Sequence, residues 1–281
     1  MVTINNGQIS VKISTKGAEI RSIKRGETEY MWSPDPKFLD LTAPILFPIC
    51  GGLKEGRYEL FGKSYEMPKH GFASLCTFEV EKKTESSVTM ILRDSEMTRK
   101  MYPYSFAFRV SFEAIGNSLG VTYDAENLDS KVMYCTFGTH ETYACPGGME
   151  NYEIVFPERE TLYAYGLNGN IVTDYTKLIV DDSNTLVLRD SYFLLNGLVF
   201  RNLKSRSAEI VSKTDGRRVK IDFDGFNNLI LWNKPGGSFI CFEPWCGLPD
   251  VVGSSFDISE KEGMFAVAPG EHLIRTHTIT V

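Results

Sequence analysis

Apolar and polar residues alternate along most of the chain, and elsewhere β-branched and aromatic residues form short runs. Alternation is typical of half-buried β-strands, and apolar runs are typical of strands covered on both faces. The two patterns predict strands at residues 8–14, 18–24, 77–81, 88–92, 106–114, 119–127, 132–137, 208–213, 219–223, 229–232, 239–243, 264–267 and 274–281. Turn residues separate these runs, as in Asn168-Gly169-Asn170, and residues 115–119 indicate a hairpin.

Helix signals are weak. The two candidates are residues 95–101, with Asp94 or Ser95 as the N-cap, and residues 191–195. Many short strands with few helices predict two packed sheets or a barrel. No linker, low-complexity tract or repeat interrupts the chain. We therefore expect an all-β fold, a large antiparallel β-sandwich, in a single domain over residues 1–281.

The composition narrows the function classes. A hydrophobic content of 42% in 281 residues supports a sizeable core. The formal net charge is −6 and no basic patch is present, which argues against a nucleic-acid partner. The N-terminus lacks a signal-peptide pattern, and no apolar run approaches the roughly 18 residues of a membrane span. We expect a cytoplasmic protein, monomeric or homodimeric, without a membrane partner.

The cysteine pattern favours free thiols. The six cysteines are scattered without a CxxC motif, which in a reducing cytoplasm favours unpaired thiols. Cys241 and Cys246 lie on either side of Glu243, but no matching histidine or cysteine pair stands near them in sequence. The sequence therefore predicts no metal site. The six residues are Cys50, Cys76, Cys135, Cys145, Cys241 and Cys246.

Glu243 carries the strongest chemical signal. It follows the apolar run at residues 239–242 and directly precedes Pro244 and Trp245. Desolvation disfavours a charged carboxylate, so burial there raises the glutamate pKa toward the range of a general base. The alternative is a strand-end glutamate tied to a nearby arginine or backbone amide.

Two of the four histidines add to this signal. His70 follows a predicted strand and precedes Gly71, which frees the backbone for a turn. His140 follows the strand at 132–137; if that strand continues, His140 shares a face with Gly138, which leaves room beside it. A structural role is the alternative for each. His272 and His277 lie among alternating polar residues of the last strand, which predicts structural side chains on a solvated face.

These residues stand in motifs that resemble those of the aldose 1-epimerase (galactose mutarotase) family, especially its shorter LacX-like branch. The order and spacing of the motifs extend over essentially the whole chain. The resemblance implies a galactose mutarotase-like supersandwich, a small-molecule sugar substrate and no cofactor. The motifs are GAEIRS (17–22), EYMW (29–32), APILFPICG (43–51), HGFA (70–73), YPYSF (102–106), FGTH (137–140), LW (231–232), CFEPW (241–245) and PD (249–250).

The resemblance also implies roles. Glu243 is the general base that takes the proton of the anomeric hydroxyl, and His140 is the general acid that protonates the ring oxygen. The ring opens, the carbonyl end rotates, and closure reverses the roles. His70 corresponds to a histidine that hydrogen-bonds the sugar. Trp232 offers an apolar face to the sugar ring, or is a core tryptophan. Glu243 and His140 are expected about 4–8 Å apart across one pocket.

Three positions depart from the family pattern. Gly52 stands where the family usually has a sugar-contacting arginine, and Lys54 and Arg57 are the candidates to replace it. Glu141 stands where the branch usually has proline, and Asn196 lies at about the place of a sugar-binding aspartate. The expected substrate-binding residues are therefore His70, Trp232, Asn196 and Lys54.

Three functions compete with a mutarotase. One is a non-catalytic carbohydrate-binding or regulatory protein on the same fold, since fold does not fix function. Another is a hexose-phosphate epimerase, which needs a basic cluster near the pocket mouth. The third is a glycosidase, which needs two facing carboxylates, whereas only Glu243 is a clear candidate. The candidates for the basic cluster are Lys54, Arg57, Lys63 and Lys69.

Overall fold

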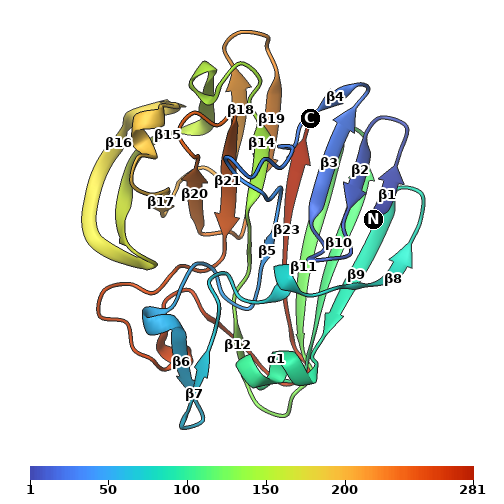
Figure 1. The fold of residues 1–281 in the computed structure, drawn as a ribbon, viewed down its shortest axis with the longest axis vertical. Helices are drawn as coiled ribbons and strands as arrows, with labels where there is room; N and C mark the ends of the chain where they lie inside the picture. Colours follow the sequence, from blue (N-terminus) through green and yellow to red (C-terminus); the bar gives the residue numbers. More distant parts are fainter.

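One large antiparallel sheet dominates the computed structural model, which describes residues 1–281 (Figure 1). Its strands follow the order β5-β13-β21-β20-β17-β15-β18-β19-β23-β11-β10-β9-β8, with β14 paired to β21 and β16 to β15. The bounds are β5 (Ile45–Leu46), β8 (Glu79–Lys83), β9 (Ser87–Arg93), β10 (Phe106–Ile115), β11 (Ser118–Asn127), β13 (Gly138–Thr139), β14 (Glu141–Ala144), β15 (Tyr152–Asn168), β16 (Ile171–Val187), β17 (Leu198–Arg201), β18 (Ser207–Ser212), β19 (Arg218–Asp222), β20 (Asn228–Trp232), β21 (Phe239–Trp245) and β23 (His272–Thr280).

A second, four-stranded sheet at the N-terminus forms another layer. Figure 1 shows it in front of β9–β11, and backbone hydrogen bonds from Asn5 to Glu85 and from Phe78 to Thr15 join the layers. Two short ribbons complete the strands. The bounds are β1 (Val2–Asn5), β2 (Ser10–Ile13), β3 (Ile20–Arg25), β4 (Thr28–Glu29), β6 (Arg57–Leu60) with β7 (Lys63–Glu66), and β12 (Met133–Cys135) with β22 (Phe265–Val267).

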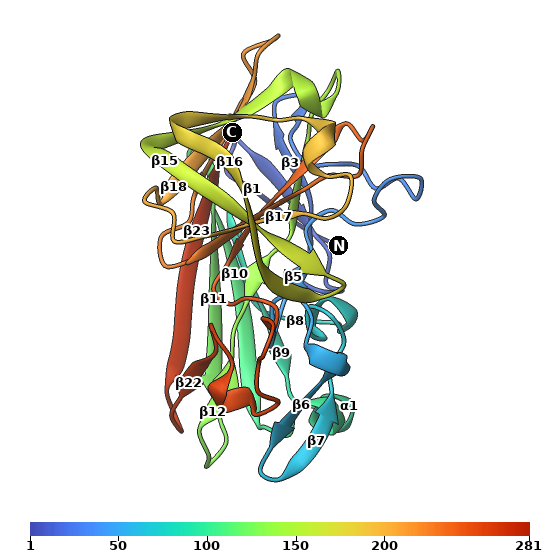
Figure 2. The same cartoon turned by 90° about the vertical axis from the view of Figure 1, so that its left-hand side faces the viewer.

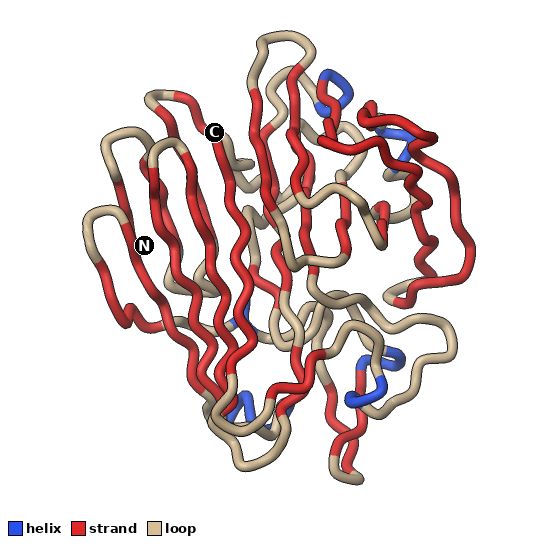
Figure 3. Tube along the Cα trace, turned by 180° about the vertical axis from the view of Figure 1, so that it is seen from behind, coloured by secondary structure: helices blue, strands red, loops and turns tan.

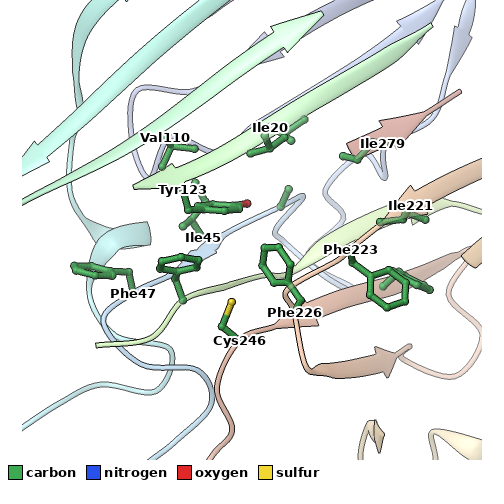
Figure 4. Packing of buried hydrophobic residues seen from close by; sticks show 14 of the residues in the cluster. Ile20, Ile45, Phe47, Val110, Tyr123, Ile221, Phe223, Phe226, Cys246 and Ile279 are labelled. Carbon is green, nitrogen blue, oxygen red and sulfur yellow. The ribbon is translucent and has the colours of Figure 1, made fainter. Parts of the chain in front are cut away.

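A continuous apolar core joins the layers. Alternate residues of β10, β11 and β23 are buried, and they belong to the same hydrophobic cluster as residues of β2 and β3. Figure 4 shows Val110 of β10, Tyr123 of β11 and Phe226 converging in this core. The predicted antiparallel β-sandwich is confirmed, and its predicted strands coincide with observed ones to within a few residues.

One of the two helix predictions is confirmed and the other is wrong. Helix α1 (Glu96–Met101) forms as predicted, and Ser95 caps it by accepting a hydrogen bond from the Thr98 amide. The helix expected at residues 191–195 is wrong, because the chain makes only a 3₁₀ turn at Asp190–Tyr192. Further 3₁₀ turns lie at Lys54–Gly56, Ala73–Leu75, Met149–Asn151 and Ile258–Glu260. None of the helices combines the length and apolar character needed to cross a bilayer.

The sequence patterns did not predict the longest hairpin. Strands β15 and β16 have 17 residues each. They form a curved ribbon at the left of Figure 1, which faces the viewer in Figure 2 and lies at the right when seen from behind in Figure 3. Pro157 and many charged residues lower the strand propensity, and much of the ribbon is exposed, so the apolar alternation is weak. The turn signal Asn168-Gly169-Asn170 does lie at its tip.

The strand predicted at 132–137 is shorter than expected and lies outside the main sheet. Strand β12 pairs with β22 and ends at Cys135, after which β13 and β14 pair with β21 in the main sheet. The strand therefore does not continue to His140, so the condition under which His140 would share a face with Gly138 along it is not met. The transfer between sheets nevertheless brings His140 beside the strand that carries Glu243.

Candidate active site

His140 and Glu243 face each other across neighbouring antiparallel strands. Gly138 pairs with Trp245 and Glu141 pairs with Phe242, so that counting inward places His140 opposite Glu243. Side chains at directly opposite positions have Cβ atoms about 4.5–5.5 Å apart. Accordingly, His140 Nε2 lies 3.5 Å from Glu243 Oε1, closer than expected from the sequence. Sheet register alone thus creates the acid–carboxylate contact.

Burial perturbs both groups of this pair. The side chain of Glu243 is 2% exposed and that of His140 is 15% exposed. Desolvation raises the pKa of Glu243 well above its ordinary value, and the nearby Glu141 carboxylate adds to this while Lys69 opposes it. Desolvation lowers the pKa of His140 to about 4, with a further contribution from Lys69. Both groups therefore disfavour their charged forms.

His70 lies beside this pair in an uncommon backbone conformation. Its φ is +67°, a left-handed value held by hydrogen bonds from the His70 amide to the Gly51 carbonyl and from the Phe47 amide to the His70 carbonyl. The Gly51 amide donates to Nδ1 at 3.1 Å. Since Nδ1 accepts, the neutral ring carries its proton on Nε2 and can donate to a ligand. Burial lowers the pKa of His70 well below its ordinary value.

A cavity of about 250 Å³ opens over these three side chains. Its wall includes two indole rings, and His70 packs edge-on against one of them, Trp245, at 5.4 Å between ring centroids. Gly138 is needed there, because a Cβ at this position would lie 2.7 Å from the Trp245 ring. The cavity is lined by Leu39, Gly51, Gly52, Lys69, His70, His140, Leu167, Gly169, Asn170, Asn196, Gly197, Val199, Ile230, Trp232, Glu243, Trp245 and Pro249.

Comparison with known proteins identifies the family. A family model described as aldose 1-epimerase matches residues 1–279. The chain belongs to the aldose 1-epimerase family. It is 29% identical to the plasmid-encoded protein LacX of Lactococcus lactis subsp. lactis, over 100% of this chain and 99% of that protein. Membership makes the chain an isomerase-type enzyme.

Solved structures of the family have the same fold. A galactose mutarotase related enzyme from Lactobacillus acidophilus superposes with a TM-score of 0.92 at 30% identity, covering 99% of this chain and 96% of that one. A galactose mutarotase-like protein from Lactobacillus casei superposes with a TM-score of 0.94 at 26% identity, covering 100% and 99% of the two chains. The galactose mutarotase-like sandwich implied by the sequence is therefore confirmed.

The departure at Gly52 has a structural explanation. A Cβ at this position would lie 2.4 Å from the Cβ of Asn170, which stands at the tip of the β15–β16 hairpin. The tip is docked by hydrogen bonds from the Val172 amide to the Asp250 carbonyl and from the Val252 amide to the Val172 carbonyl. Any side chain at position 52 therefore conflicts with the docked hairpin. Asn170, which the sequence indicated only as a turn residue, brings a polar group to the cavity wall instead.

The expected substrate-binding residues lie in different places. Trp232 and Asn196 line the cavity. The side-chain Nδ2 of Asn196 donates to the Leu167 carbonyl at 3.2 Å, which joins Asn196 to the β15–β16 hairpin. Lys54 lies outside the cavity, because its ammonium group sits over the Phe256 ring at 4.6 Å. Lys69, from the basic-cluster candidates, lines the cavity.

One set of side chains has ligands of the types that bind metals. His140, Cys241 and Glu243 each place a ligand atom within 4.8 Å of the other two. The Cys241 thiol, however, is absent from the cavity wall and contacts the Thr142 hydroxyl at 3.3 Å, and burial raises its pKa well above the ordinary value. A protonated, enclosed thiol is a poor ligand, and the set favours proton transfer instead. All six cysteines are free and buried.

The predicted solvated setting of His277 is wrong. It is 1% exposed, and its Nε2 lies 2.6 Å from the Oε1 atom of Glu141, which is equally buried. His272 does lie on a solvated face, paired with Asp124 at 2.7 Å. Strand alternation in the last strand could not distinguish the two, because both have polar neighbours. The signal available was Glu141, which directly follows His140 and is the only acidic residue between 132 and 149.

Proposed function

We propose that the protein is a sugar 1-epimerase that interconverts the α and β anomers of an aldose. The observation that carries the proposal is the His140–Glu243 pair, 3.5 Å apart in the lining of a cavity of about 250 Å³. Ring opening needs one group to accept a proton from the anomeric hydroxyl and another to donate one to the ring oxygen. A carboxylate and an imidazole side by side supply both.

The pair accounts for the reversibility of the reaction. With Glu243 as base and protonated His140 as acid, the anomeric proton moves to Glu243, the ring oxygen takes the His140 proton, and the C1–O5 bond breaks to give the open-chain aldehyde. Rotation about the C1–C2 bond exposes the other carbonyl face. On closure O5 attacks C1, His140 recovers the O5 proton and Glu243 returns its proton to the new anomeric oxygen.

The pair holds one proton before and after each transfer. Desolvation disfavours charge on both groups and therefore favours the neutral arrangement, with the proton on Glu243, over the ionic one. Because the two groups are in contact, the same proton can move between them as the ring opens and closes. In this proposal His70 Nε2 donates to a sugar oxygen, and the Trp245 and Trp232 rings in the cavity lining contact sugar C–H groups.

Anomer exchange spectroscopy by NMR tests this function directly. Saturation transfer between the anomeric proton signals of free and phosphorylated aldoses gives the exchange rate above the spontaneous background. We expect at least one free aldose to exchange faster with wild-type protein, and Glu243→Gln to remove that excess. Tight binding without added exchange would instead favour the carbohydrate-binding alternative.

The hexose-phosphate alternative has less support. Of the four basic residues considered for a phosphate cluster, only Lys69 lines the cavity. Lys54 and Arg57 both contact the Phe256 ring, at 4.6 Å and 3.7 Å from its centroid. One exposed lysine gives weak discrimination for a phosphate dianion. We therefore expect unphosphorylated sugars to be the better substrates in the same NMR panel.

A further inference from the structure

A second imidazole–carboxylate pair lies on the opposite face of the strand that follows His140. Glu141 Oε1 is 2.6 Å from His277 Nε2, and the Tyr143 hydroxyl donates to Glu141 Oε2 at 3.0 Å. The Glu141 and His277 side chains are 2% and 0% exposed. The His277 ring stacks on Tyr123 at 5.7 Å and meets the edge of Phe226 at 5.8 Å. We call Glu141, Tyr143 and His277 the buried triad.

A polar group in this position needs an explanation, because burial of a carboxylate is unfavourable unless it is paired and hydrogen-bonded. Buried ion pairs are often no more stabilising than apolar residues of the same volume, and the best-attested use of such pairs is to fix a structural register. The register in question here is that of β14 on β21. It is this register that brings His140 opposite Glu243.

His140 lacks the usual orienting partner. In acid–base sites the second ring nitrogen is commonly held by a third group, but His140 Nδ1 is buried without a hydrogen-bond partner. The ring contacts only the Glu243 carboxylate at 3.5 Å and the His70 ring at 5.8 Å between centroids, so its orientation also depends on its backbone position. Regular pairing is interrupted at His140 itself, between β13 and β14, so the first anchored side chain beyond the interruption is Glu141.

We propose that the buried triad is a positioning device for the His140–Glu243 pair. The bonds from His277 and Tyr143 fix Glu141, and Glu141 fixes the backbone of His140 across the plane of the sheet. This inference rests on the proposed epimerase function for its kinetic readout, although the geometry can be tested without a substrate.

The triad also acts on Glu243 electrostatically. Glu141 is opposite Phe242, the residue before Glu243, and its carboxylate contributes to the raised pKa of Glu243. The other titratable groups around Glu243 are His140, Lys69, Cys50 and Cys241. Those around Glu141 are His277, Tyr143 and Tyr123. Removing the Glu141 charge therefore lowers the pKa of Glu243. Because the active pair holds one proton and Glu243 is the last of the two groups to lose it, the alkaline limb of the rate profile moves to lower pH.

The test compares Glu141→Gln with a matched control, Asp124→Asn. The control removes the Asp124 carboxylate of β11, which pairs with His272 of β23. His272 is 38% exposed, and neither residue lines the cavity. We expect Glu141→Gln to lower kcat by roughly tenfold to a hundredfold with little change in KM, since small misplacement of a catalytic group costs this much. Its alkaline limb should shift to lower pH, whereas the control should match wild type.

Tyr143→Phe keeps the inference testable if Glu141→Gln does not fold. It removes one donor to Glu141 and leaves the ring in place, so we expect a severalfold smaller kcat. In both variants the ¹⁵N-imidazole NMR signals of His140, assigned by their loss in His140→Asn, should move relative to wild type. The inference is overturned if the folded variant has the kcat, pH profile and His140 signals of the control.

The two proposals fail in different ways. A wild-type protein without anomer exchange on any sugar contradicts the proposed function, and the His140 signals then decide the positioning role alone. An active wild type with an unaffected triad variant contradicts only the positioning role.

Discussion

The two imidazole–carboxylate pairs, His140–Glu243 and Glu141–His277, have the same chemistry in different surroundings. The first is 3.5 Å apart, lines a cavity and is partly exposed at His140. The second is 2.6 Å apart, fully enclosed and hydrogen-bonded by Tyr143. Access to a ligand and a looser contact leave the first pair free to exchange protons with a substrate, while the second has no space for one. Residue type therefore identifies the candidate acid–base groups, whereas packing determines which of them can reach a ligand and react.

The largest expected difference between the pairs is in turnover. Glu243→Gln removes the base and His140→Asn removes the acid, and general acid–base groups typically contribute about 10²–10⁴ in rate. Each variant should lose at least about a hundredfold in anomer exchange rate, measured by NMR above the spontaneous background. Sugar affinity, measured by calorimetry, should change far less. Near wild-type turnover in Glu243→Gln would mean that another carboxylate is the base.

For the free energy of unfolding, substitutions in the Glu141–His277 pair should have the larger effect. His277→Leu leaves the Glu141 carboxylate buried without its partner, and such a loss typically destabilises a protein by about 3–5 kcal/mol. His140→Asn, beside a cavity, should lower the free energy of unfolding by about 1 kcal/mol. Urea unfolding followed by fluorescence measures both. The double variant Glu141→Leu/His277→Leu should recover most of the loss, since apolar pairs replace buried ion pairs well; equal losses at His277 and His140 would abolish the distinction between the pairs.

His70 sharpens the comparison because it belongs to the cavity without being part of the acid–base pair. His70→Ala should weaken sugar binding by roughly 1–3 kcal/mol, the value of one buried hydrogen bond, and should change kcat less than Glu243→Gln does. His70→Asn is a useful second variant, since asparagine tolerates the left-handed backbone at this position. His272→Ala serves as the control. A hundredfold loss of kcat with unchanged affinity would instead place His70 in the proton-transfer step.

The smallest expected effect concerns the rim of the cavity. Gly52→Ala places a Cβ 2.4 Å from the Asn170 Cβ and forces the hairpin tip to move, and such overpacking costs typically about 1–3 kcal/mol. We expect a reduced sugar affinity with an intact His140–Glu243 pair. Asn170→Gly in the same background should relieve the strain. Gly120→Ala, with its nearest atom at 3.8 Å, is the matched control; equal affinities for the two alanine variants would show that the tip does not shape the cavity.

Much of the candidate site was predictable from the sequence. Glu243 after the apolar run at 239–242 and His70 before Gly71 are local signals, because desolvation and turn chemistry act over a few residues. Strand alternation likewise predicted the sandwich and most of its strands. The role assignments for Glu243 and His140 stay predictions until turnover is measured.

Only the tertiary structure decided which distant residues meet. No local pattern indicates that β14 pairs with β21 in the register that sets His140 against Glu243, or that the polar-looking strand β23 buries His277 against Glu141. Lys54 and Asn170 illustrate the same limit. Lys54 lies over Phe256 and therefore outside the cavity, and Asn170 reaches the cavity because its hairpin docks beside Gly52, more than a hundred residues away in sequence. Residue types and local spacing determine the chemistry that is available, whereas long-range strand pairing and packing determine where it is used, because those contacts join segments that are remote along the chain.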